Sequence, residues 1–142
     1  MEGGQTNEFR PLILVAEDDD SNFKLIKAII GKKCDIQWAK NGEEIVALFK
    51  EYGKEAKAIL MDIKMPVMNG LDATKIIREE NKEIPIIMQT AYAFSSDKEN
   101  AMNAGASEVL VKPITLSILR GTLTKYFPEL CLLYTSPSPR DR

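Results

Sequence analysis

Short apolar segments alternate with segments of helical periodicity along most of the chain, and this alternation constrains the possible fold more than any other feature. The apolar segments have the length of buried strands, and the segments between them repeat their apolar residues at the three- and four-residue spacing of a helix. A regular succession of strand and helix predicts an α/β fold, in which a parallel sheet is covered by helices on both faces. The predicted strands are residues 12–16, 35–39, 58–61, 85–89 and 109–111.

Capping residues and glycines mark where the predicted helices begin and end. Asp20 or Ser21 is expected to cap a first helix that ends at Gly31, and Thr115 is expected to cap the last helix. The other helices are expected to begin at Asn41-Gly42, at Asn69-Gly70 and after Ser95-Ser96-Asp97, with Gly105 ending the fourth. The core face of the last helix is expected to carry Leu116, Leu119, Leu123 and Tyr126.

The composition is that of one globular domain. The chain has 142 residues, of which 44% are hydrophobic and 28% charged, enough to bury a single core. A net charge of -2 and a pI of about 5.3 provide no basic excess, so direct contact with nucleic acid is not expected. No apolar stretch reaches membrane-spanning length, and the polar start is not a signal peptide. A cytoplasmic location without membrane insertion is therefore predicted.

The chain contains no histidine. This absence removes nucleophilic catalysis by Ser–His or Cys–His pairs and most zinc sites. Cys34 and Cys131 form neither a disulfide framework nor a metal-binding spacing. Any polar chemistry must therefore rely on carboxylates, hydroxyls and lysines.

Polar and charged residues follow four of the predicted strands, at the point where each strand ends. The carboxyl ends of parallel strands meet at one edge of a sheet, which is where open α/β sheets bind their ligands. We therefore expect Glu17, Asp18, Asp62, Thr90 and Lys112 to lie close together. The neighbouring Asp19 and Asp20 have a simpler interpretation, as a helix cap and a solvated turn.

Three of these residues are carboxylates, whose mutual repulsion calls for a cation. At about 4 Å, each pair costs roughly 4 kcal/mol at an effective dielectric near 20. Mg²⁺ prefers hard oxygen ligands, so Glu17, Asp18, Asp62 and the backbone carbonyl of Lys64 are expected to bind it. A carboxylate can also attack a phosphoryl group, which leads to the hypothesis of an acyl phosphate on Asp62.

The remaining polar groups suit a phosphoryl group, whose charge is spread over three oxygens. The Lys112 ammonium, the Thr90 hydroxyl and the backbone N–H of Ala91 are predicted to bind these oxygens. Taken singly, each residue has an ordinary explanation, as a turn carboxylate, a β-forming threonine or a surface lysine. Their coincidence at the ends of successive strands favours a functional site.

Residues 10 to about 127 resemble the receiver domain of bacterial two-component response regulators. The similarity rests on residues 14–19, 61–70, 90–91, 105–107 and 112–113. It implies a doubly wound flavodoxin-like (βα)5 fold with five strands in the order 2-1-3-4-5. It also implies a cis peptide bond between Lys112 and Pro113. Residues 61–78 are most similar to the receivers of hybrid histidine kinases.

The resemblance also implies roles for the residues at the strand ends. Asp62 becomes the phosphoacceptor, Glu17 and Asp18 the acidic metal pair, Thr90 the switch hydroxyl and Lys112 the phosphate-binding lysine. The phosphodonor is a phosphohistidine on a histidine kinase or histidine phosphotransfer domain. Phosphorylation then shifts the equilibrium between two conformations and alters binding to a downstream protein or an attached domain.

Such a domain is regulatory and catalyses only its own phosphorylation and dephosphorylation. If the chain belongs to a hybrid kinase, the full protein is a histidine kinase. Two alternatives stay open: a Mg²⁺-dependent aspartyl-phosphate hydrolase, and a flavodoxin-like cofactor-binding module. The first usually has a second Asp two residues after the nucleophile, where this chain has Lys64. The second needs a phosphate-binding first loop, whereas the loop at 17–20 is acidic.

The chain departs from the family at Val109, where an aromatic switch residue is common. Coupling of the site to the rest of the domain is therefore expected to rely on Thr90 and the loop after it, including Tyr92 and Phe94. Lys64 and Tyr92 are also predicted to shield the phosphoryl group and lengthen its life. Unchanged acyl-phosphate lifetimes in Lys64→Asn and Tyr92→Ala variants would contradict this prediction.

Three segments are expected along the chain. Residues 1–9 are interpreted as an N-terminal extension and residues 10–130 as the receiver domain. Residues 131–142 lack helical periodicity, are rich in Ser and Pro, and are similar to the translation of a sequencing adapter. We interpret them as a non-native tail.

Overall fold

The computed structural model describes residues 10–91 and 96–126. Their strands form a single five-stranded parallel sheet in the order β2-β1-β3-β4-β5. The predicted fold class, a doubly wound parallel α/β sheet, is therefore confirmed. The strands are β1 (Leu12–Ala16), β2 (Asp35–Ala39), β3 (Ala56–Asp62), β4 (Ile86–Thr90) and β5 (Glu108–Val111). The helices are α1 (Asp20–Ile30), α2 (Gly42–Tyr52), α3 (Gly70–Glu80), α4 (Asp97–Ala104) and α5 (Leu116–Tyr126).

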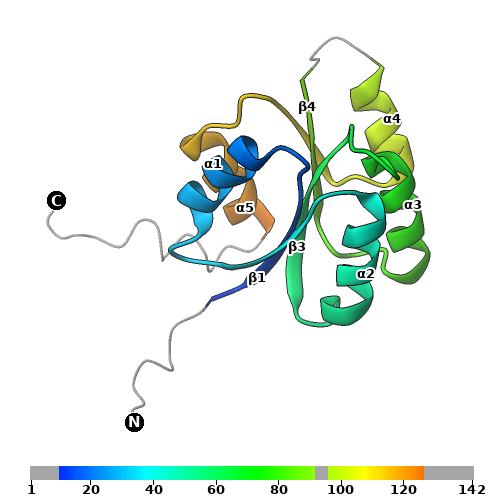
Figure 1. Cartoon of the computed structure of the whole chain (residues 1–142), viewed down its shortest axis with the longest axis horizontal. Helices are drawn as coiled ribbons and strands as arrows, with labels where there is room; N and C mark the ends of the chain where they lie inside the picture. The colour runs from blue at the N-terminus through cyan, green and yellow to red at the C-terminus, as the bar shows by residue number, and fades with distance from the viewer. Residues whose placement is uncertain (1–9, 92–95, 127–142) are drawn as a thin grey trace, which may run out of the picture.

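The helices form a layer on each face of the sheet. Figure 1 shows α1 and α5 on one face and α2, α3 and α4 on the other. The chain leaves β1 toward β2 on one side and returns to β3 on the other, so the strand order reverses at β1. A reversal of this kind opens a crevice above the carboxyl ends of the neighbouring strands, where ligands of this fold class bind.

Alternate residues of the strands pack against the two helical layers. In β1, Ile13 and Val15 belong to the core beneath α1 and α5, whereas Leu14 and Ala16 belong to the core beneath α2 and α3. In β3, Leu60 also faces α1 and α5. Because side chains alternate along a strand, the next residue on that face is a carboxylate in both strands, Glu17 and Asp62.

Helices α1 and α5 begin with side-chain caps. Oδ1 of Asp19 accepts a hydrogen bond from the Ser21 N–H (2.9 Å), and Asp19 has the extended backbone of a cap. The predicted cap at Asp20 or Ser21 is therefore wrong by one or two residues, because both already lie in the first turn of α1. The predicted cap at Thr115 is confirmed, since Oγ1 accepts from the Ile118 N–H (3.2 Å).

Other ends differ from the predictions in detail. Ser96 occupies the N-cap position of α4, but its side chain makes no capping hydrogen bond. Gly105 ends α4 with a φ of 120°, as expected for a glycine stop. Leu116 was expected in the core but is 48% exposed. The core contact of α5 starts one turn later, at Leu119 and Leu123.

Within residues 10–91 and 96–126, no helix combines the length and the apolar character needed to cross a bilayer.

Candidate functional site

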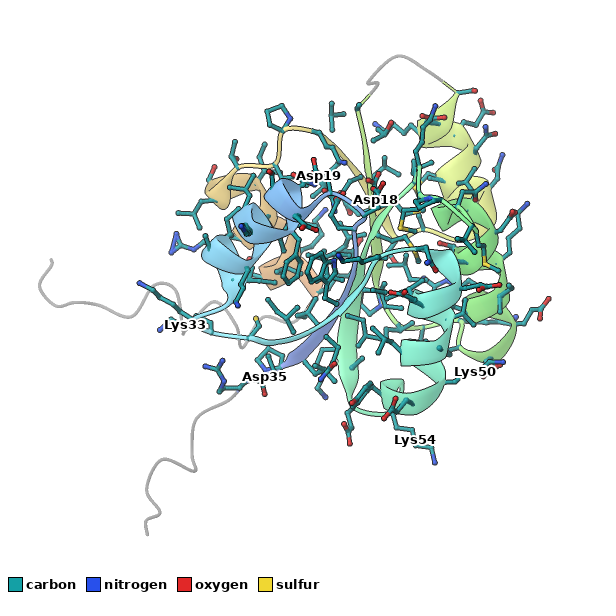
Figure 2. The ribbon with its side chains drawn as sticks, viewed as in Figure 1. Asp18, Asp19, Lys33, Asp35, Lys50 and Lys54 are labelled. Carbon is teal, nitrogen blue, oxygen red and sulfur yellow. The ribbon has the colours of Figure 1, made fainter. Side chains whose placement is uncertain are left out.

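The polar residues predicted from the sequence follow the carboxyl ends of four neighbouring strands. Asp62 is the last residue of β3 and Thr90 the last of β4. Glu17 follows β1 directly, and Lys112 follows β5. Figure 2 shows Asp18 and Asp19 at this end of the sheet, and Asp35 and Lys54 at the opposite end.

Three carboxylates meet above β1 and β3. Oxygens of Glu17, Asp18 and Asp62 lie within 4.8 Å of one another. Glu17 and Asp62 are buried, whereas Asp18 is exposed. This donor set fits Mg²⁺, which takes hard oxygen ligands while retaining water and a substrate phosphate on its open side. The predicted fourth ligand, the Lys64 carbonyl, stays a prediction. The N–H of Lys64 donates to Oδ1 of Asp62 at 3.4 Å.

Lys112 binds the carboxylates from the β5 side. Its Nζ donates to Oδ2 of Asp62 at 2.9 Å and lies 3.6 Å from Oε1 of Glu17. The strand places Lys112 here through a hydrogen bond from its N–H to the Thr90 carbonyl (2.8 Å) and through a cis bond to Pro113, as the resemblance implied. Burial lowers the pKa of Lys112, but the hydrogen bond and charge of Asp62, with the charge of Glu17, outweigh it and raise the pKa. Lys112 is therefore a cation at neutral pH.

Glu17 is fully buried among these charges. Burial raises its pKa from 4.5 to about 7, although the hydrogen bond from Asn22 and the charge of Lys112 oppose this rise. The charge of Asp62 contributes to this rise. A single ammonium group therefore does not fully compensate the buried carboxylates. A divalent cation would favour the ionised form of Glu17, because metal ligands bind without their protons.

Three neighbours of Glu17 were not predicted from the sequence. Nδ2 of Asn22 donates to Oε1, and the Asp19 N–H donates to Oε2 at 3.2 Å. Nε1 of Trp38 donates to the Glu17 carbonyl at 2.8 Å. Only Asn22 had a usable signal in the sequence, because it lies in the first turn of the helix that follows the acidic loop.

Thr90 contacts the start of α4. Its hydroxyl donates to Oδ2 of Asp97 at 3.2 Å, a contact that was not predicted. Ala91 is exposed and is the last residue described before the gap. Tyr92 and Phe94, to which modulating and coupling roles were assigned, lie outside the described residues.

Val109 lies away from the acidic cluster. It is half-buried in β5, pairs with Met88, and packs against the core beneath α2 and α3. An aliphatic side chain at this position leaves no ring to move between exposed and buried positions.

The loop between β3 and α3 keeps the backbone close to Asp62. The Gly70 N–H donates to the Ile63 carbonyl at 2.8 Å. A Cβ at Gly70 would lie 2.2 Å from the carbonyl oxygen of Asp62. Only glycine permits this approach, so the sequence Asn69-Gly70 shapes the loop in addition to starting α3.

The sheet is doubly wound and parallel, and its strand ends bring together acidic residues, a threonine and a lysine. This combination is typical of phosphoacceptor signalling domains. Residues 13–124 match the family model of the response regulator receiver domain. The chain belongs to this family. It is therefore a regulatory phosphoacceptor domain of phosphorelay signalling.

Known proteins with similar sequences and structures include parts of kinases. The chain is 41% identical over 129 residues to hybrid signal transduction histidine kinase I of Dictyostelium discoideum, covering 82% of this chain and 7% of that protein. It is 30% identical to the receiver domain of the sensor histidine kinase PA1611 of Pseudomonas aeruginosa, which was crystallised with a magnesium ion in its active-site cleft. That match has a TM-score of 0.77 and covers 83% of this chain and 98% of the other.

A third match comes from a complex. The chain is 28% identical, with a TM-score of 0.77, to a chain in the co-crystal structure of the Saccharomyces cerevisiae histidine phosphotransfer signaling protein Ypd1 and the receiver domain of its response regulator Ssk1. This match covers 87% of this chain and 91% of the other. Family membership favours a receiver domain over both the hydrolase and the flavodoxin-like alternatives.

Proposed function

We propose that Asp62 accepts a phosphoryl group from a phosphohistidine, in a reaction that requires Mg²⁺ bound by Glu17, Asp18 and Asp62. The observation that carries this proposal is the gathering of three carboxylates, whose oxygens lie within 4.8 Å of one another, beside a lysine ammonium 2.9 Å from Asp62. One solvent-accessible edge of the sheet thereby combines a carboxylate nucleophile, ligands for a cation and a fixed positive charge.

Each group has a separate task in phosphoryl transfer. An Asp62 oxygen forms a bond to phosphorus while the bond between phosphorus and the donor nitrogen breaks. Lys112 then faces the charge of the phosphoryl oxygens, and the Thr90 hydroxyl and the Ala91 N–H donate to them. Glu17, Asp18 and Asp62 would hold Mg²⁺ where its charge would offset part of the negative charge on these oxygens. The Lys64 carbonyl completes the ligand set, and the side chains of Lys64 and Tyr92 slow the entry of water.

Phosphorylation changes protein binding because two acceptors compete for the Thr90 hydroxyl. Its hydroxyl donates to Asp97 at the start of α4, and a phosphoryl group on Asp62 offers it a more highly charged acceptor. Movement of Thr90 toward this acceptor breaks the contact with α4. The exposed surface around α4 then changes its affinity for a downstream protein or an attached domain. This route does not need an aromatic residue at Val109.

The phosphodonor is a histidine kinase or a histidine phosphotransfer domain, and the location is cytoplasmic without membrane insertion. The similarity to a hybrid kinase and to a complex containing a histidine phosphotransfer protein supports this choice. The low net charge supports protein partners rather than nucleic acid. Residues 10–130 constitute the receiver domain.

Incubation with acetyl phosphate and Mg²⁺ tests the proposal. We expect a single base-labile, acid-stable phosphoryl adduct by intact-protein mass spectrometry. The adduct does not form when Mg²⁺ is chelated before acetyl phosphate is added, or in Asp62→Asn. Asp35→Asn, at the opposite end of the sheet, is the matched control and keeps the adduct. Absence of the adduct in the wild-type chain, or its persistence in Asp62→Asn, contradicts the proposal.

A further inference from the structure

A buried carboxamide lies beside the acidic cluster. Gln89 is the penultimate residue of β4, is 0% exposed, and pairs in register with Asp62 of β3. Ile87, two residues earlier, belongs to the core beneath α1 and α5. Because side chains alternate along a strand, Gln89 points to that same face, where its other strand neighbour is Leu110. A polar side chain in such a place requires an explanation.

Asn22 links this carboxamide to Glu17. Nδ2 of Asn22 donates to Oε1 of Glu17 and to Oε1 of Gln89, the second at 3.4 Å. One amide group of α1 is therefore fixed between a carboxylate at the end of β1 and a carboxamide of β4. Nε2 of Gln89 is buried and makes no hydrogen bond to any part of the chain that the structure describes.

The buried carboxamide of Gln89 does not stabilise the folded domain. An apolar side chain of similar size would fill the same space in β4 without burying an amino group that lacks an acceptor. Gln89 therefore costs stability, and residues that do so are found where function requires them. The group that benefits from its contacts is Asn22 and, through Asn22, the carboxylate of Glu17.

We propose that Asn22 and Gln89 are positioning residues that fix the Glu17 carboxylate in the orientation in which it binds Mg²⁺. Gln89 holds the Asn22 amide, and Asn22 holds Oε1 of Glu17. A carboxylate oxygen has lone pairs for both a hydrogen bond and a metal ion, so the two contacts are compatible. Partners of this kind orient metal ligands, and their loss typically weakens metal binding about 10- to 100-fold. The inference rests on the proposed Mg²⁺ site.

Two substitutions separate positioning from a role in folding. Asn22→Ala removes the donor to Glu17 and is expected to raise the Mg²⁺ dissociation constant about tenfold. Gln89→Met keeps the volume and removes both polar atoms. It is expected to raise the Mg²⁺ dissociation constant as well, while the thermal unfolding midpoint without Mg²⁺ stays equal or rises. The double variant is expected to bind Mg²⁺ no more weakly than Asn22→Ala, because Gln89 acts through Asn22.

Trp38 provides the readout. It is the only tryptophan of the chain, and its Nε1 donates to the Glu17 carbonyl. Titration of the full chain with MgCl₂, followed by Trp38 fluorescence and checked by calorimetry, gives the dissociation constants. Gln37→Met in β2, away from the acidic cluster, is the control and leaves Mg²⁺ binding unchanged.

The possible results are distinct. Unchanged Mg²⁺ affinity in Asn22→Ala and Gln89→Met overturns the inference. A lower unfolding midpoint in Gln89→Met also overturns it, because the carboxamide would then serve the fold. If the wild-type chain itself does not bind Mg²⁺, the proposed function fails, and the inference fails with it. Weaker binding in both variants, with a stable Gln89→Met, supports the inference.

Discussion

Val67 holds the loop after Asp62 in a conformation that a β-branched residue rarely adopts. Its φ is 68°, and it is the non-glycine residue with a positive φ among those described. The Met68 N–H donates to the Pro66 carbonyl at 2.7 Å, so residues 66–68 form a γ-turn centred on Val67. The side chain is 73% exposed and contributes little burial to offset the strain. The loop between β3 and α3 therefore contains one residue in an energetically unfavourable backbone conformation.

Val67→Gly is expected to raise the free energy of unfolding by about 1 kcal/mol. The positive φ costs Val67 about 1–3 kcal/mol, and glycine recovers most of this while losing about 0.4–1 kcal/mol through the entropy of the unfolded chain. Urea unfolding measures the change. Val111→Gly, at another exposed valine that lies in β5, serves as the control and is expected to lower the stability. A fall in stability for Val67→Gly as well would show that the turn is not strained.

At the scale of elements, the hydrogen bond between Thr90 and Asp97 joins the end of β4 to the start of α4. Asp97→Ala is expected to increase amide hydrogen exchange in α4, because the helix loses a contact with the sheet worth about 1 kcal/mol. The increase should resemble the one that phosphorylation produces in the wild-type chain. Hydrogen–deuterium exchange of residues 97–104 measures both.

Glu99→Ala is the matched control for this experiment. Glu99 is an exposed acidic residue in the same first turn of α4, so its loss changes the interaction with the helix dipole by a similar amount. If both variants change the exchange of α4 equally, the effect belongs to helix charge, and the proposed coupling through Thr90 loses its support.

Elements with uninterrupted apolar patterns were predicted well, and interrupted ones less so. β3 begins at Ala56, two residues before the predicted start, because the exposed Lys57 breaks the apolar run that was used to find the strand. Leu116 matched the helical period of α5 but lies outside the core. Periodicity identifies which face of a helix is apolar, but it does not tell how far along the helix the neighbouring core extends.

At the scale of the molecule, the sequence could predict which residues gather at one edge, because parallel pairing alone brings the strand ends together. It could not predict contacts between side chains far apart in the chain. Asn22 and Gln89 are hydrogen-bonded although they are 67 positions apart in the sequence. Arg78 donates to the Gly105 carbonyl (2.8 Å) and to Ser107 Oγ (3.2 Å), which joins α3 to the loop between α4 and β5. Such contacts depend on the packing of whole helices, for which the local pattern carries no signal.

The attachment of the last helix to the sheet makes one contribution to how the stability of the domain varies with pH. The Tyr126 hydroxyl of α5 donates to Oε1 of Glu108 in β5 (2.8 Å) and also lies 3.0 Å from the Ser107 carbonyl oxygen. The Tyr126 hydrogen bond lowers the pKa of Glu108, and Lys125 adds to this effect against a smaller opposing effect of burial. Burial and Glu108 together raise the pKa of Tyr126 from 10.0 to about 12.

These two shifts have opposite signs. A lowered pKa for Glu108 contributes stability above its ordinary value of 4.5, and this contribution disappears as pH falls through the folded-state pKa. A raised pKa for Tyr126 contributes stability below 10.0, and this contribution disappears as pH rises from 10.0 toward 12. The hydrogen bond between these residues therefore stabilises the domain most between the two limits.

Tyr126→Phe is expected to lower the free energy of unfolding by about 1–2 kcal/mol near neutral pH. The difference from the wild-type chain should shrink as pH falls below 4.5 through the folded-state pKa of Glu108, and again as pH rises from 10.0 toward 12, since the stabilising contributions of the two shifts disappear there. Urea unfolding of both proteins across this range measures the difference. Tyr52→Phe, on α2 and away from β5, is the control for removing a tyrosine hydroxyl elsewhere in the domain. A constant difference at all pH values for Tyr126→Phe would show that packing of the ring, rather than its bond to Glu108, attaches α5.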